Sequence, residues 1–110
     1  MRLEKENLNS LSKQMELIAK AFFASKEYIH MHMRLNDSGS FDMKHSQTVF
    51  IKRVESTYEM LNPLEQLFIN NDFFYEDYPL WWKDLYSKSQ YQHYKKRTII
   101  HFLRLFYDED

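Results

Sequence analysis

The sequence predicts an all-α protein, and three observations lead to this class. The chain of 110 residues has one Gly and two Pro, so tight turns, which β architectures need every ~10 residues, are scarce. Hydrophobic residues make up 44% of the chain and aromatic residues 17%, enough for burial to offset the entropy of ordering it. Apolar side chains recur at helical spacings of three and four. We expect one domain over residues 1–110, a compact bundle of about five helices.

A long amino-terminal helix over about residues 2–33 is the first predicted element. Its periodic positions are Leu8, Leu11, Met15, Ile18, Phe22, Ser25, Ile29 and His32. A stripe of this kind indicates a helix that packs into the core of a bundle. As a coiled-coil seam it would instead join two copies, which predicts a homodimer through Leu8, Leu11, Met15, Ile18 and Phe22.

Turn-forming residues divide the middle of the chain. Residues 36–40, which contain the only Gly, predict a break and a loop. Ser46 or Thr48 is expected to cap a second helix that ends near Leu61. Asn62 and Pro63 mark a boundary and the first turn of a short third helix, because the residue before proline avoids the α region.

The last thirty residues predict a short helix, a serine turn and a longer helix. The short helix covers residues 78–86, starts at a proline and spans about two turns. Ser87, Lys88 and Ser89 interrupt it, and Ser89 is the expected N-cap of the final helix. The inward positions of that helix are Tyr91, Tyr94, Thr98, Ile99, Phe102, Leu105 and Phe106.

Charge is segregated along the chain although the net charge is only −1. Residues 81–107 carry six Lys and Arg against one Asp, whereas residues 36–80 carry three Lys and Arg against eight Asp and Glu. Asp108, Glu109 and Asp110 close the chain. Such segregation produces a local field that selects partners even when the net charge is close to zero.

The order of elements near the carboxyl end also resembles a known family. A short apolar helix, a turn with serine at its end and a helix with basic first turns follow "LNPLEQLFI". This order, over residues 61–105, resembles the helix-turn-helix of sigma-factor region 4 and of related small phage-type transcriptional regulators. Residues at matching places are Ser87, Ser89, Tyr91, Lys95, Lys96 and Thr98. The stretch "YSKSQYQHYKKRTIIHFL" is also similar to the carboxy-terminal part of small uncharacterised mollicute proteins.

If the final helix binds in a groove of duplex DNA, the chemical type of each exposed side chain predicts whether it contacts a base or a phosphate. Gln90, Gln92 and His93 would face base edges, and glutamine suits a bidentate contact with adenine. Lys88, Lys95, Lys96 and Arg97 would neutralise phosphates. The predicted nucleic-acid-binding set is Lys88, Ser89, Gln90, Gln92, His93, Lys95, Lys96 and Arg97.

Several other kinds of protein are not expected from this sequence. His30 and His32 lie two residues apart and point in opposite directions on a helix, so no metal site is predicted. No phosphate-binding loop, dinucleotide fingerprint or nucleophile elbow occurs, so we expect neither an enzyme nor a cofactor. The chain has no Cys, its start is charged and no apolar run approaches ~20 residues, so we expect a cytoplasmic protein without a membrane span.

These observations predict a non-enzymatic DNA-binding or transcription-associated regulator that uses a helix-turn-helix-like unit over residues 61–107. The alternative is a helical protein-interaction or structural module that binds no nucleic acid. In that alternative the three consecutive cations make no contact with a partner. The dense aromatic cluster over residues 73–86 and the first helix together recruit a protein partner.

Overall fold

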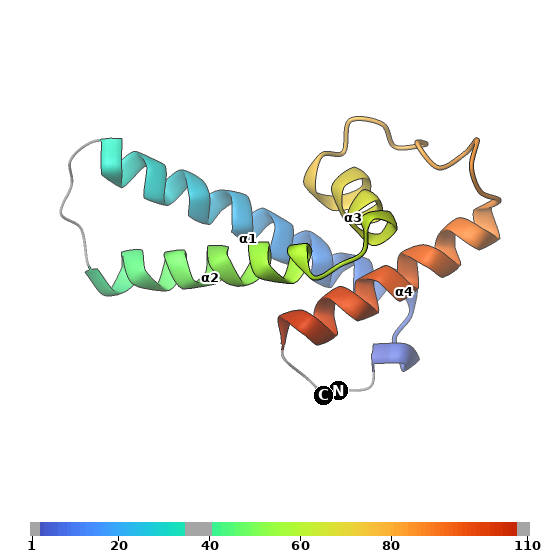
Figure 1. The fold of residues 1–110 in the computed structure, drawn as a ribbon, viewed down its shortest axis with the longest axis horizontal. Coiled ribbons are helices and arrows are strands. Elements are labelled where there is room, and N and C mark those ends of the chain that lie inside the picture. Colours follow the sequence, from blue (N-terminus) through green and yellow to red (C-terminus); the bar gives the residue numbers. More distant parts are fainter. Residues whose placement is uncertain (1–2, 35–40, 108–110) are drawn as a thin grey trace.

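The computed structural model describes residues 3–34 and 41–107, and α-helices make up most of this part of the chain (Figure 1). The elements are a 3-10 turn η1 (Leu3–Lys5), α1 (Leu8–Arg34), α2 (Phe41–Glu59), α3 (Pro63–Ile69), a π-helical turn η2 (Asn70–Phe74) and α4 (Lys88–Phe106). The described residues contain no strand, so the predicted all-α class is confirmed, with four α-helices rather than about five. The predicted break at 36–40 and the acidic residues 108–110 lie outside the described residues.

The helices form a hairpin with a smaller cluster packed at one end. Figure 1 shows α1 and α2 side by side and antiparallel, while α3 and α4 gather at the end of the hairpin away from Arg34 and Phe41. The molecule therefore measures 51 × 32 × 22 Å along its principal axes. The hairpin of α1 and α2 accounts for the longest dimension of the molecule. Helix α4 packs against α1, α2 and α3.

The core lies where α1, α2 and α4 meet. Leu11 and Met15 from α1, Val54 from α2, and Ile99 and Phe102 from α4 have no exposed surface. The buried residues of α1 recur at spacings of three and four, and those of α4 occupy one broad side of the helix, which is why the apolar pattern predicts both helices. The inward face predicted for the last helix is confirmed at its carboxyl half, where Thr98, Ile99, Phe102 and Phe106 are buried.

The predicted dimer seam belongs to this single-chain core. Leu11, Met15, Ile18 and Phe22 are buried, and Leu8 is half-buried and packs against the same cluster. Because the chain covers this stripe with its own α2 and α4, the stripe offers no free apolar surface to a second copy. Within one chain these residues therefore form a core stripe, and the homodimer stays a prediction.

Local signals place α3 as predicted, whereas α2 begins earlier than predicted. The Asn62 side chain accepts a hydrogen bond from the Glu65 amide at 2.8 Å, and the Glu65 carboxylate accepts one from the Asn62 amide at 3.0 Å. This reciprocal cap and Pro63 in the first turn fix the start of α3. Ser46 and Thr48 lie inside α2, because neither Gly nor Pro interrupts the helix before them.

The short helix predicted at residues 78–86 does not form. The chain there makes consecutive turns, with the amides of Trp81 and Lys83 each bonded to a carbonyl three residues earlier. Trp81 and Trp82 both reach Tyr91 of α4. A helix would point these adjacent side chains about 100° apart, so the turns allow both to pack on α4. The first helix of the predicted helix-turn-helix is therefore absent, and α3 and α4 are joined by a segment of turns, residues 75–87.

The final helix is present but starts earlier than predicted. Ser87, not Ser89, is the N-cap, and its hydroxyl accepts a hydrogen bond from the Gln90 amide at 3.1 Å. The Gln90 side chain in turn accepts a hydrogen bond from the Ser87 amide at 3.0 Å. Ser89 is thus an exposed residue of the first turn of α4.

Candidate functional site

Helix α4 is cationic along its whole length. Residues 88–106 include Lys88, Lys95, Lys96, Arg97 and Arg104, and no Asp or Glu. One side of this helix is buried against α1, α2 and α3. The opposite side, which we call the outward face of α4, carries Gln90, His93, Arg97, His101 and Arg104, all exposed.

The amino-terminal half of α4 is anchored by a buried carboxylate from the π-helical turn. The Asp72 side chain is only 6% exposed and accepts hydrogen bonds from Trp81 Nε1 at 2.9 Å and from the Tyr91 hydroxyl at 2.8 Å. Lys95 Nζ lies 3.7 Å from the same carboxylate. Asp72 thereby connects η2, the segment of turns and α4, so it fixes the position of all three relative to one another.

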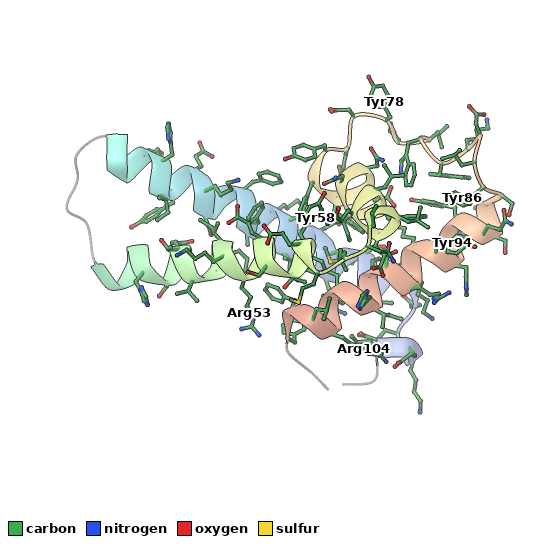
Figure 2. All side chains as sticks on the ribbon, in the orientation of Figure 1. Arg53, Tyr58, Tyr78, Tyr86, Tyr94 and Arg104 are labelled. Atoms are coloured by element: carbon green, nitrogen blue, oxygen red, sulfur yellow. The ribbon has the colours of Figure 1, made fainter. Side chains whose placement is uncertain are left out.

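Aromatic rings surround this carboxylate. Trp82 stacks on Tyr91 with ring centroids 4.3 Å apart and planes 9° from parallel. The buried Phe68 ring contacts Trp81 and Tyr91 at 5.0 and 5.9 Å. Three of the seven aromatic residues of the predicted cluster, Trp81, Trp82 and Tyr86, therefore hold this segment against α4, whereas Phe74 and Tyr75 contact Phe23 of α1. Figure 2 shows Tyr86 and Tyr94 between these parts of the chain, whereas Tyr78 points away from the body.

This environment changes the acidity of Tyr91. Burial raises the pKa of the Tyr91 hydroxyl well above its ordinary value of 10.0, and the hydrogen bond to Asp72 and the charge of Asp72 raise it further. The raised pKa means that the folded protein holds this hydroxyl in its neutral, hydrogen-bond-donating form.

A measurable pH dependence follows from this raised pKa. Because the unfolded tyrosine loses its proton first, the stability that neutral Tyr91 contributes is fully present below about pH 10 and is lost as the pH rises further. Between about pH 10 and 11 we expect the free energy of unfolding to fall by at most ~1 kcal/mol from this group, since solvent screens the partly exposed ring. Urea unfolding at several pH values measures this fall in the free energy of unfolding. The Tyr91→Phe variant should no longer show the fall, whereas the Tyr78→Phe variant should still show it. An equal fall in both variants would contradict its assignment to Tyr91.

The residues predicted to bind nucleic acid do not share one environment. Lys88, Ser89, Gln92, His93 and Arg97 are exposed. Of the two cations among them, neither Lys88 nor Arg97 has an ion pair or hydrogen bond within the described residues. These side chains are therefore available to a partner.

The other three predicted residues are engaged within the chain. The Gln90 side chain caps α4, so it is not free to contact a base in this conformation. Lys95 is only 19% exposed, pairs with Asp72 and lies 5.3 Å from the centre of the Phe73 ring. Lys96 Nζ donates to the Glu4 backbone carbonyl at 3.2 Å. Consecutive helix positions point about 100° apart, which is why "KKR" presents its three charges in different directions.

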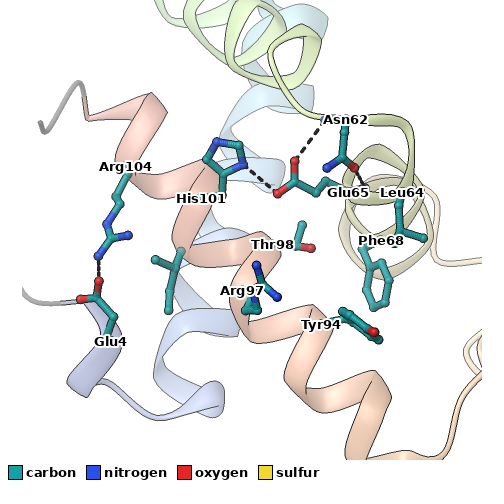
Figure 3. Close-up of a pocket in the computed structure, with 11 residues that line it drawn as sticks. Glu4, Asn62, Leu64, Glu65, Phe68, Tyr94, Arg97, Thr98, His101 and Arg104 are labelled. Atoms are coloured by element: carbon teal, nitrogen blue, oxygen red, sulfur yellow. Dashed lines mark hydrogen bonds and ion pairs between the residues drawn. The ribbon is translucent and has the colours of Figure 1, made fainter.

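A groove borders the outward face of α4. It has a volume of about 600 Å³ and lies between α4 and the first turns of α3, with Glu4 of η1 at one end (Figure 3). Two of its basic side chains have acidic partners within the chain: His101 Nδ1 lies 2.7 Å from a Glu65 carboxylate oxygen, and Arg104 pairs with Glu4. Arg97 lies one turn before His101 on α4, on the side of Tyr94, and has no ion pair or hydrogen bond within the described residues.

Sequence reasoning did not find several residues that shape this site. The spacing of Arg97, His101 and Arg104 is four and three, so the stripe they form was readable from the helical period. His101 and its partner Glu65 are separated by 36 positions in the sequence, and Tyr91 and its partner Asp72 by 19 positions. No local sequence pattern indicates contacts over such separations.

Within residues 3–34 and 41–107, no group of three or more His, Cys, Asp or Glu side chains could hold a metal ion. None of the helices in this part of the chain is long and apolar enough to span a bilayer.

Comparisons of the chain with protein-family models, with curated proteins and with solved structures find no match.

Proposed function

We propose that this protein is a non-enzymatic DNA-binding regulator that contacts the phosphate backbone through the outward face of α4. The observation that carries the proposal is that α4 has five Lys and Arg, no acidic residue, and an exposed side on which Arg97 is unpaired among the described residues. Cations on one helix neutralise phosphates and release counterions, which supplies most of the affinity for nucleic acid. His93 continues this face toward the start of α4, while the exposed Lys88 and Gln92 project from other sides of the same turns.

The absence of the first helix of a helix-turn-helix changes how such contact is made. Residues 75–87 contain the stretch where that helix was predicted, and they carry Glu76, Asp77 and Asp84. We therefore propose contact through phosphates, with Arg97 on the outward face as the principal group and Lys88 as a second exposed cation at the amino end of α4, and we assign Lys95 to the fold. Phosphate contacts position a protein on DNA without reading its sequence.

Binding to a fluorescently labelled duplex of ~20 base pairs tests this proposal. We expect micromolar binding at low ionic strength, with the logarithm of the association constant falling linearly as the logarithm of salt concentration rises. A duplex whose anisotropy does not change with protein at low salt would reject the proposal.

A second candidate function is favoured by a specific observation. Tyr78, Leu80 and Leu85 on the segment of turns are 73%, 60% and 62% exposed. Aromatic and aliphatic side chains on an exposed, irregular segment act as anchors at protein interfaces. The neighbouring acids Glu76, Asp77 and Asp84 would suit a partner whose apolar patch has a basic rim. This candidate predicts that duplex DNA is not bound even at low salt.

A further inference from the structure

The groove beside α4 has the size and the lining of a binding site for a single small group. Its volume of about 600 Å³ lies in the range of pockets that hold small ligands. Figure 3 shows Arg97 and Tyr94 along the α4 side of the groove and Asn62 and Leu64 on the α3 side. One ligand in this groove would therefore contact a cation, an aromatic ring and an amide.

Charge in the groove favours an anion. Glu4 pairs with Arg104, and the Glu65 carboxylate lies 2.7 Å from His101 Nδ1, so both carboxylates are engaged within the chain. Arg97 is exposed and has no such partner within the described residues. A guanidinium group in this situation binds a phosphate well, because it offers parallel donors to two phosphate oxygens.

The other groups favour a flat ring next to that phosphate. Tyr94 is half-buried and contacts the rings of Phe68, Tyr86 and His93 with interplanar angles of 55°, 54° and 64°. None of these described rings stacks parallel to Tyr94. The Asn62 side-chain oxygen caps α3, while its Nδ2 has no partner in the described part of the chain and can donate a hydrogen bond. A flat heterocycle with acceptor atoms matches this arrangement.

We propose that the groove binds one unpaired nucleotide of a nucleic acid strand, with the base against Tyr94 and the adjoining phosphate on Arg97. Only a base outside a duplex can enter, because paired bases are stacked with their neighbours and do not expose a face. This inference rests on the proposed function, because the nucleotide would bind to the same cationic face of α4. The preferred partner of the groove is then single-stranded DNA or RNA.

A comparison of four oligonucleotides on the unmodified protein tests this inference. The probes are oligothymidine, oligouridine, an abasic strand of equal length and charge, and a duplex. Stacking of one base contributes about 5- to 100-fold in affinity, so oligothymidine or oligouridine should bind tighter than the abasic strand by about that factor. The ratio between the two base-bearing strands identifies DNA or RNA. Equal affinity for the base-bearing and abasic strands would overturn the inference.

A matched pair of variants locates the effect. Tyr94→Phe retains the ring and should bind oligothymidine like the unmodified protein, whereas Tyr94→Leu should bind it no tighter than the abasic strand. Circular dichroism checks that each variant folds, and if Tyr94→Leu does not fold the abasic comparison decides alone. Equal binding by two folded variants would also overturn the inference.

The outcomes separate this inference from the proposed function. If every probe binds equally, phosphate contact through α4 stands and the nucleotide site fails. If only base-bearing single strands bind, the nucleotide site stands and duplex contact is wrong. If no probe binds at low salt, both fail.

Discussion

Replacing Asp72 by alanine is expected to lower the free energy of unfolding by about 3 kcal/mol. The carboxylate is almost fully buried and accepts hydrogen bonds from Trp81 and Tyr91 while pairing with Lys95. Its removal leaves two donors and a partly buried ammonium group without a partner, and each of these groups then lacks both the protein contact and full hydration. Urea unfolding followed by tryptophan fluorescence measures the change.

Asp77→Ala is the matched control for this experiment. Asp77 is exposed on the same segment of turns, so its loss should change stability by no more than about 0.5 kcal/mol. We also expect Asp72→Ala to shift the tryptophan emission of the folded state toward the red, because Trp81 loses the contact that holds it against Phe68. Equal stabilities of the two variants would show that Asp72 does not anchor residues 75–87.

The parts of the fold that depend on local chemistry were predictable from the sequence. The stripe of α1 repeats over six turns, and Asn62 followed by Pro63 and Glu65 defines a helix start within four residues. The start of α4 was missed for a local reason. Ser87 and Ser89 each have a glutamine three residues later, so both fit the capping pattern equally. Tertiary packing, not the pattern, selects Ser87.

The parts that depend on distant contacts were not predictable. Residues 78–86 have the apolar spacing of a short helix, but Trp81 bonds to Asp72 and Trp82 stacks on Tyr91. These contacts override a weak local preference, since a helix of two turns is marginal without packing. For the same reason the amphipathic stripe of α1 could not distinguish a dimer seam from a core stripe, because both bury the same residues.

The candidate site was predicted in its position but not in its details. The cationic helix was readable from "KKR" and the absence of acids, and Lys88, Gln92, His93 and Arg97 are exposed as binding would require. Lys95 could not be separated from its neighbours in the sequence, because its partner Asp72 lies on a different element. A helical projection with about 100° per residue places Arg97, not Lys95, on the outward face.

The double substitution Lys88→Ala/Arg97→Ala is expected to weaken DNA binding by about 10- to 100-fold at low salt, because it removes two phosphate contacts. Both side chains are exposed and lack partners within the described residues, so the fold should not change. Lys13→Ala/Lys52→Ala is the matched control, since it removes two exposed cations from α1 and α2 and changes the net charge equally. Lys95→Ala should reduce stability while leaving the salt dependence of binding unchanged.

The salt dependence of duplex binding tests most directly whether the outward face of α4 meets phosphate. The slope of the logarithm of the association constant against the logarithm of salt concentration is measured for the unmodified protein and both double variants. We predict that Lys88→Ala/Arg97→Ala makes the slope shallower by about two units, since each phosphate contact contributes ~0.9. Lys13→Ala/Lys52→Ala should keep the original slope. Equal slopes for the two double variants would contradict binding through α4.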